Sequence, residues 1–174
     1  MILETPRLIL RPFQNEDIGR LSQLMSNRDF MRFSLGPRTL EQTHAFLQKF
    51  LAWDQGGLPS QFAVVLRGKE SMLGYCGFLH HAELPGEVEI GYRLDPAYWN
   101  RGLMTEAARA VRYYAFIELK LPRVISLIHP DNIPSRRVAE KIGLRPEEEI
   151  TFRGFPTIVF AASREQWEAA NAAG

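Results

Sequence analysis

An alternating segment that runs directly into a helical one constrains the fold of this chain most. Residues 87–94 alternate polar and apolar side chains, which is typical of a β-strand with one buried face. A turn containing Pro96 and Gly102 follows, and apolar residues then recur at helical spacing as far as Leu119. We therefore predict a strand, a turn and a long amphipathic helix over residues 102–119.

The remaining periodic segments predict strands before this unit and both strands and helices after it. Further strands are expected at residues 7–11, 61–66, 72–78 and 124–128, and near Ile150 and Ile158. Helices are expected after an Asn15 cap, after a Thr39–Gln42 capping box, and over residues 132–142 before Gly143. Early antiparallel strands, a strand–helix–strand–helix unit and a final hairpin indicate an α+β fold with a mixed sheet.

Length and composition indicate one globular domain over residues 1–174. The chain has no internal repeat, low-complexity tract or Pro/Gly/Ser linker, and its 45% hydrophobic and 24% charged residues are ordinary for a globular protein. Its longest apolar runs, such as residues 158–162, are far below the roughly 20 residues of a membrane span, so we expect no membrane association. The N-terminus lacks a secretory pattern and Cys76 is the single cysteine, so we expect a reduced, cytoplasmic protein.

Charge is distributed unevenly along a nearly neutral chain. The net charge of +1 argues against a nucleic-acid-binding protein, whose binding domain is usually strongly basic. Residues 93–145, however, hold ten Lys/Arg against five Asp/Glu, whereas the rest of the chain holds eleven against fifteen. A basic third within a neutral protein favours a small polyanionic ligand.

The turn between the predicted strand and helix, residues 95–107, is the candidate site for such a ligand. Unpaired backbone N–H groups at a helix start point outward and attract anions, and Gly102 would allow close approach of a phosphate. The alternative is that Gly102 only ends a loop before a helix. Nucleotide-binding P-loop and dinucleotide motifs are absent, as is a G-x-S-x-G elbow. His80 and His81 would face opposite sides of a strand, so we expect no metal site.

Several short motifs together resemble one family. They are residues 4–12 (ETPRLILRP) with Asp17, residues 89–92 (EIGY), residues 98–102 (YWNRG) with residues 105–107 (TEA), residues 114–116 (YAF), Asn132 with Ser135, and residues 141–144 (KIGL). In this order and spacing the chain resembles, over nearly its whole length, the GNAT superfamily of acyl-CoA-dependent N-acetyltransferases. The similarity is strongest to the branch with the ribosomal-protein N-terminal acetyltransferases.

The resemblance implies a fold and a reaction. The fold would be a GNAT-type α+β domain with a mixed, mostly antiparallel twisted sheet of about seven strands and about four helices. The reaction would be direct transfer of an acetyl group from acetyl-CoA to a primary amine, without a metal. The acceptor would be a protein N-terminal α-amine or a small molecule such as an amino acid, a polyamine or an aminoglycoside, and a homodimer is compatible with the family.

The resemblance also assigns residues to the cofactor. The family's Q/R-x-x-G-x-G/A phosphate loop falls on residues 99–104, with Trp99 in place of the first Gln/Arg and Met104 in place of the small last residue. Met104 would crowd the pyrophosphate. The expected cofactor-binding residues are Trp99, Asn100, Arg101, Gly102, Leu103, Met104, Thr105, Asn132, Ser135 and Arg136. Arg137 is an alternative to Arg136, and solvated surface arginines are the alternative to both.

The resemblance also implies three catalytic candidates. Glu89 could accept the ammonium proton of the acceptor, directly or through water, or could be a solvated strand carboxylate paired with a basic neighbour. Ser135 could protonate or hydrogen-bond the leaving sulfur, with Asn132 on the pantetheine arm, or both could simply cap a helix. Some members of the family use a tyrosine as the acid, which makes Tyr92 the third candidate.

Other residues and functions stay open. Phe30, Phe33, Phe46 and Trp53 would belong either to the acceptor side or to plain core, and we expect Cys76 to be a small buried hydrophobe. A non-catalytic acyl-CoA-binding module with the same fold and a generic phosphate-binding domain are the competing functions.

Overall fold

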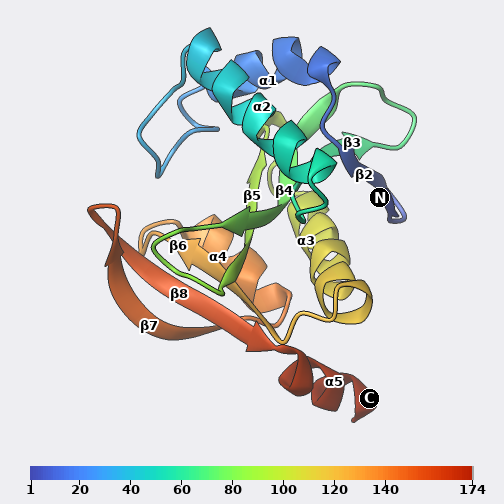
Figure 1. Cartoon of the computed structure of the whole chain (residues 1–174), viewed down its shortest axis with the longest axis vertical. Coiled ribbons are helices and arrows are strands. Elements are labelled where there is room, and N and C mark those ends of the chain that lie inside the picture. Colours follow the sequence, from blue (N-terminus) through green and yellow to red (C-terminus); the bar gives the residue numbers. More distant parts are fainter. Residues whose placement is uncertain (174) are drawn as a thin grey trace.

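One eight-stranded sheet runs through the computed structural model, which describes residues 1–173 (Figure 1). The spatial order of the strands is β1-β2-β3-β4-β5-β6-β8-β7. Every neighbouring pair is antiparallel except β5 with β6, which is parallel. The strands are β1 (Leu3–Glu4), β2 (Leu8–Pro12), β3 (Gln61–Leu66), β4 (Met72–His80), β5 (Val88–Leu94), β6 (Arg123–Ile128), β7 (Arg145–Phe152) and β8 (Phe155–Ser163).

Helices cover both faces of this sheet. The α-helices are α1 (Ile18–Met25), α2 (Leu40–Gln55), α3 (Leu103–Tyr113), α4 (Ile133–Lys141) and α5 (Arg164–Ala172). Helices α1 and α2 lie together at one end of the molecule, and α3 and α4 lie on the other face of the sheet (Figure 1). No helix among the described residues is long and apolar enough to span a bilayer.

The two faces of the sheet carry separate cores. On β3, Phe62 and Val64 pack with the α3 side, whereas Ala63 and Val65 pack with α1 and α2. A strand buried on both faces needs apolar residues at successive positions, which explains why β3 shows no polar alternation. Helices therefore cover both faces of the sheet at its centre, where β3, β4 and β5 lie.

The α+β class and the mixed, mostly antiparallel sheet are confirmed, with small differences in the number of elements. The eighth strand is β1, whose two residues are too few to show a period in sequence. The fifth helix is α5, whose only large apolar residue is Trp167 and which begins at a Ser163 capping box with Gln166. Neither element has the apolar periodicity from which strands and helices are predicted.

The start of the first helix and the end of the third differ from expectation. Asn15 lies inside a 3-10 turn (Asn15–Asp17) capped by Gln14, rather than capping a helix itself. The Asp17 carboxylate causes this: it accepts the Gln14 amide at 2.8 Å and both Arg11 guanidinium donors, which fixes the turn ahead of α1. The 102–119 helix is α3 followed by one π-helical turn (Tyr114–Glu118).

The parallel strands β5 and β6 are held together by side chains where their ladder is shortest. Their register has one pair, Glu89 with Ile125. Beyond it, the Ser126 hydroxyl donates to the carbonyl of Ile90 at 2.7 Å, and the Leu127 amide donates to the Glu89 carboxylate at 3.3 Å. Side-chain bonds in place of a continued backbone ladder allow the strands to part toward their C-terminal ends. We call this the β5–β6 gap.

Candidate active site

The turn between β5 and α3 has the backbone of an anion-binding site. Asn100 and Gly102 adopt left-handed conformations, with φ of 60° and 72°. Within residues 1–173, the amides of residues 100–105 have no hydrogen-bond partner, and the first amide of α3 to be paired is that of Glu106. These unpaired amides surround the positive end of the α3 dipole, an arrangement that binds phosphate groups.

Side-chain hydrogen bonds and an ion pair hold the turn on both sides. Asp95 caps the short Pro96–Tyr98 turn through the Ala97 amide at 3.0 Å and is paired with Arg20 of α1. The Trp99 indole N–H donates to the carbonyl of Leu94 at 2.8 Å. The anion-binding backbone is therefore rigid before any ligand arrives.

On its other side the turn is tied to the N-terminal segment through Glu106. The Glu106 carboxylate accepts from the Thr5 hydroxyl at 2.6 Å, from the Arg7 amide at 2.9 Å and from the Arg7 guanidinium at 2.6 Å. Burial acts to raise the pKa of Glu106, but these hydrogen bonds outweigh it and lower the pKa. Arg7 also donates to the carbonyl of Arg101 at 2.9 Å, so one arginine spans the turn and the helix.

The predicted loop residues divide into exposed and buried ones. Trp99 and Arg101 lie at the surface, and the Arg101 guanidinium rests 5.2 Å above the Tyr98 ring. Leu103, Met104 and Thr105 are buried. Met104 is 7% exposed and its side chain packs in the core beneath α3. Its expected crowding of the pyrophosphate stays a prediction.

The start of α4 lies across the gap from the turn and brings Ser135 to Tyr92. Asn132 caps α4 by accepting the Ser135 amide at 3.3 Å, and the Tyr92 hydroxyl donates to the carbonyl of Ser135 at 2.7 Å. Burial raises the pKa of Tyr92 well above its ordinary value. The Ser135 hydroxyl itself forms no hydrogen bond with the described part of the chain, and Arg136 donates to the carbonyl of Pro130 at 2.9 Å.

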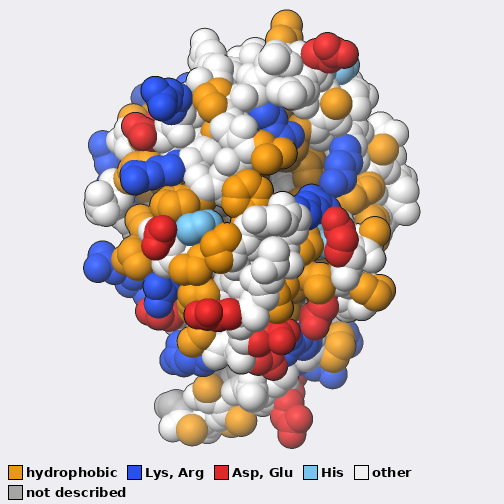
Figure 2. Space-filling view, turned by 90° about the vertical axis from the view of Figure 1, so that its left-hand side faces the viewer, with side chains coloured by type: hydrophobic (Ala, Val, Ile, Leu, Met, Phe, Trp, Pro, Cys, Tyr) orange, Lys and Arg blue, Asp and Glu red, His pale blue; other side chains and the backbone are white. Residues whose placement is uncertain are grey.

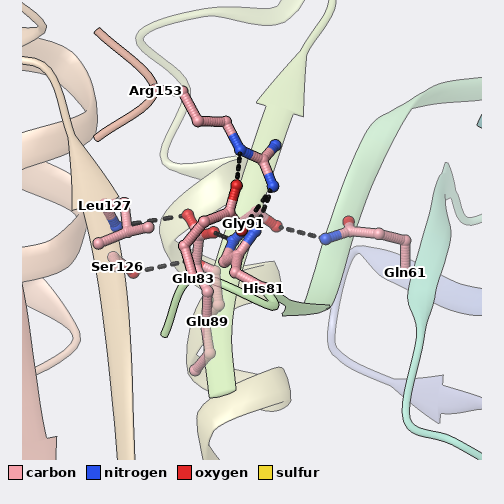
Figure 3. A network of polar contacts seen from close by, with 9 residues as sticks. Gln61, His81, Glu83, Glu89, Gly91, Ser126, Leu127 and Arg153 are labelled. Carbon is pink, nitrogen blue, oxygen red and sulfur yellow. Dashed lines mark hydrogen bonds and ion pairs between the residues drawn. The ribbon is translucent and has the colours of Figure 1, made fainter. Parts of the chain in front are cut away.

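Glu89 lies at the other edge of the gap and is buried, with 7% exposure. One carboxylate oxygen contacts His81 Nε2 at 2.5 Å, and the other accepts the Leu127 amide from β6 (Figure 3). The expectation of a solvated carboxylate is therefore wrong, although the basic neighbour exists. A carboxylate held from two sides and shielded from water can take a proton from a bound amine without first losing a water shell.

His81 is the functional candidate that sequence reasoning missed. Its Nδ1 lies 3.4 Å from Arg153 Nη2, and Arg153 also forms an ion pair with Glu83 at 2.8 Å (Figure 3). Because a guanidinium can only donate, this contact favours the tautomer in which Nδ1 accepts and Nε2–H faces Glu89. Strand β4 ends at His80, so His81 lies beyond the strand, and no local pattern predicts its contacts with Glu89 and Arg153.

The face of β5 that carries Glu89 is bordered by segments from distant parts of the chain. Arg93 donates from β5 to the carbonyls of Phe30 and Arg32 in the loop between α1 and α2. In the same loop Phe33 has a φ of 62° and stacks on His129, which follows β6, with ring centroids 5.4 Å apart. We call this face, with residues 26–55, 81–87 and 152–154 around it, the acceptor side.

The aromatic candidates serve both core and surface. Phe30 is buried with the α1–α2 core, Phe46 and Trp53 are half-buried against it, and Phe33 is 36% exposed. Cys76 is fully buried as expected, and burial raises the pKa of its thiol, which makes it inert. No group of three or more His, Cys, Asp or Glu side chains that could hold a metal occurs within residues 1–173.

Comparison with known proteins agrees with this geometry. The family model described as an acetyltransferase (GNAT) domain matches residues 7–145. An uncharacterized N-acetyltransferase of Bacillus subtilis, YnaD, is 35% identical over 150 residues, covering 84% of each chain. A spermidine N(1)-acetyltransferase of Escherichia coli is 26% identical over 149 residues, covering 84% of this chain and 77% of the relative.

Solved structures have the same fold. A GNAT-family acetyltransferase from Bacillus anthracis superposes with a TM-score of 0.82 at 32% identity, covering 95% of this chain and 99% of that one. The ribosomal L7/L12 alpha-N-protein acetyltransferase RimL, solved in complex with coenzyme A, has a TM-score of 0.81 at 20% identity, covering 95% and 99%. With the family model spanning the sheet from β2 to the start of β7, and with these relatives, the chain belongs to the GNAT family of N-acetyltransferases.

Proposed function

We propose that residues 1–174 act as one domain that transfers an acetyl group directly from acetyl-CoA to the primary amine of a small molecule or a protein N-terminus. The observation that carries this proposal is the row of unpaired amides at residues 100–105, which lies beside a gap in the sheet that opens on a buried carboxylate. A cosubstrate with a pyrophosphate at one end and a thioester at the other fits both features.

The residues of the turn suit the phosphates of CoA. The amides of residues 100–105 would bind the pyrophosphate, and Arg101 is exposed at the same turn to add charge. Arg136 donates from one side of its guanidinium to the carbonyl of Pro130, and the other side would be free to bind a phosphate of CoA. When bound in the β5–β6 gap, acetyl-CoA supplies the thioester that is attacked.

Glu89 is our candidate for the general base. An alkylamine is mostly protonated near neutral pH, and only its neutral form is nucleophilic, so a nearby carboxylate that takes this proton promotes attack. His81 Nε2–H and the Leu127 amide hold the two Glu89 oxygens in place. His81 is therefore a positioning residue, and Arg153 keeps its Nδ1 unprotonated.

Ser135 is the better candidate for the group that meets the leaving thiolate. The Tyr92 proton is engaged with the Ser135 carbonyl, and the raised pKa of Tyr92 makes it a weak proton donor. The Ser135 hydroxyl is bound to no described residue and sits in the first turn of α4, where the helix dipole stabilises negative charge. Tyr92 would then fix the first turn of α4 against β5.

Binding and turnover test the proposal separately. We expect CoA at millimolar concentration to raise the melting temperature and ATP to raise it much less, because ATP lacks the pantetheine arm that would fill the gap. We expect acetyl-CoA to release free thiol when mixed with a panel of primary amines. CoA binding without thiol release for any acceptor would instead favour a non-catalytic acyl-CoA-binding module. Equal stabilisation by ATP and CoA would contradict the cofactor assignment.

The relatives leave the acceptor open. The Escherichia coli relative is named for spermidine and the RimL structure for a ribosomal protein N-terminus, so both a polyamine and a polypeptide are candidates here. The family resemblance also leaves a homodimer open. The charges of the acceptor side discriminate among these acceptors.

A further inference from the structure

The acceptor side holds cations that have no acidic partner. None of the ion pairs among residues 1–173 includes Arg38, Lys49 or Arg93. In the space-filling view, Lys and Arg side chains lie around hydrophobic ones in the upper half of this face, and the lower half holds both acidic and basic side chains (Figure 2). The upper half corresponds to the α1–α2 end of Figure 1.

Two acidic residues that contact this face, Glu83 and Glu89, are already engaged. Glu83 is paired with Arg153 at 2.8 Å, and Glu89 contacts His81 at 2.5 Å. Asp131, which follows β6, lies 3.9 Å from His129 and is 83% exposed. Residues 26–55 also hold Asp29, Glu41 and Asp54, but none of the described acidic residues forms an ion pair with Arg38, Lys49 or Arg93.

Aromatic rings hold two of the cations at defined positions. The Arg38 guanidinium lies 5.1 Å from the Phe46 ring centroid, and Lys49 Nζ lies 5.5 Å from that of Phe50 and 4.5 Å from that of Trp53. The Phe46 and Phe50 rings are adjacent, with centroids 4.6 Å apart. Cation–π contacts reduce the freedom of these long side chains, which lowers the entropy lost when they bind an anion.

The cations also affect one another. Burial of its stem lowers the pKa of Lys49, and repulsion from Arg153 and Arg38 lowers it further. An anion placed among these groups would relieve that repulsion, whereas a second ammonium would add to it. Arg153 links this cluster directly to the His81–Glu89 pair, so the anion would lie close to the amine being acetylated.

Resting on the proposed function, we propose that the acceptor is an amine that carries a carboxylate, and that Arg38 and Lys49 bind this carboxylate. Arg93 contributes charge from β5 while its guanidinium holds the α1–α2 loop. The same chemistry is present in a free acidic amino acid and in a polypeptide whose N-terminus carries an acidic side chain. A polyamine places ammonium groups among unpaired cations and is disfavoured.

Matched acceptors test this with acetyl-CoA and thiol release. One arm compares the α-amides of glutamate and glutamine, of which only the first carries a carboxylate, and a second compares a short peptide beginning with Glu with the same peptide beginning with Gln. We expect about tenfold higher kcat/KM for the carboxylate member in at least one arm, decreasing as salt is raised, and the arm that shows the preference identifies the source. Equal use of both members, or faster turnover of spermidine, would overturn the proposal.

Variants assign the effect to the two cations. We expect Lys49→Met and Arg38→Met each to raise KM for the carboxylate acceptor severalfold to tenfold, with kcat and CoA affinity nearly unchanged. Lys69→Met, which removes an exposed lysine from the turn between β3 and β4, serves as the control and should have no effect. An unchanged KM in both Arg38 and Lys49 variants would contradict the assignment.

Binding without turnover separates this proposal from the proposed function. Calorimetry of the CoA-saturated protein would compare N-acetylglutamate with N-acetylspermidine. If no amine releases thiol but N-acetylglutamate binds and Lys49→Met weakens it, the carboxylate site stands and the catalytic proposal fails. If spermidine is acetylated and N-acetylglutamate does not bind, the catalytic proposal stands and the carboxylate site fails.

Discussion

The two sides of the β5–β6 gap differ in the kind of group that would contact a ligand. On the cofactor side, residues 95–141, the groups that would contact the ligand are mainly backbone amides and helix ends from one continuous stretch of chain. On the acceptor side they are side chains from four separated regions, joined by contacts such as Arg153 to His81. A backbone site tolerates changes of side chain, whereas a side-chain site can change its ligand by single substitutions.

The largest effect expected on the acceptor side is at Glu89. We expect Glu89→Gln to lower kcat by about a hundredfold near neutral pH, because the amide cannot accept the ammonium proton. The deficit should narrow at high pH, where the acceptor amine is neutral without help. A pH–rate profile with the preferred acceptor measures this.

The control is Glu148→Gln, which removes an exposed β7 carboxylate that forms no ion pair with any described residue, and which should retain full activity. A Glu89→Gln enzyme with wild-type kcat at pH 7 would remove Glu89 from the proton transfer.

Variants of His81 test whether this residue positions Glu89, as its contacts indicate. We expect His81→Leu to lower kcat by about tenfold with little change in CoA affinity, because Glu89 loses one of its two donors. His81→Gln, which can still present an N–H to Glu89, should recover part of the loss. Nitrogen NMR of the wild-type imidazole should show the proton on Nε2. A proton on Nδ1, or equal kcat in both variants, would contradict the positioning role.

These two sides also differ in how far the sequence predicted them. The β5–α3 turn was identified because strand alternation and a glycine before a helix are local signals. Glu89, Asn132 and Ser135 were identified as site residues through the resemblance to the family. The left-handed φ of Asn100 was not predicted, because no reliable sequence signal marks a non-glycine residue that adopts the left-handed conformation. His81 was missed because its role depends on a contact across 72 residues, with Arg153.

Gly102 tests the cofactor side. Gly102 and Gly68 have φ of 72° and 77°, so Gly102→Ala and Gly68→Ala carry similar backbone strain, roughly 1 kcal/mol each. Only the first distorts the row of amides at residues 100–105. We expect CoA affinity to fall about fivefold in Gly102→Ala and to be unchanged in Gly68→Ala, measured by calorimetry. Equal CoA affinity in the two variants would contradict the backbone site.

The smallest expected effect is on stability. It concerns the hydrogen bonds through which Glu106 holds the N-terminal segment to the cofactor side. The Glu106 carboxylate is 17% exposed and accepts three hydrogen bonds from Thr5 and Arg7. Glu106→Gln keeps the shape but removes the charge, which should cost about 1 kcal/mol of unfolding free energy at pH 7. Glu16→Gln, in the exposed part of the 3-10 turn before α1, is the matched control and should cost much less.

The pH dependence of that cost identifies its source. Because the folded-state pKa of Glu106 is lowered, its contribution is complete above the unfolded pKa of about 4.3 and is lost as the pH falls through the lower folded value. The difference in unfolding free energy between wild type and Glu106→Gln should therefore be constant from pH 7 to about pH 5 and shrink in more acidic solution. Denaturant unfolding across this range measures it, and a difference that stays constant to pH 3 would show that packing, not charge, holds the N-terminal segment to the turn.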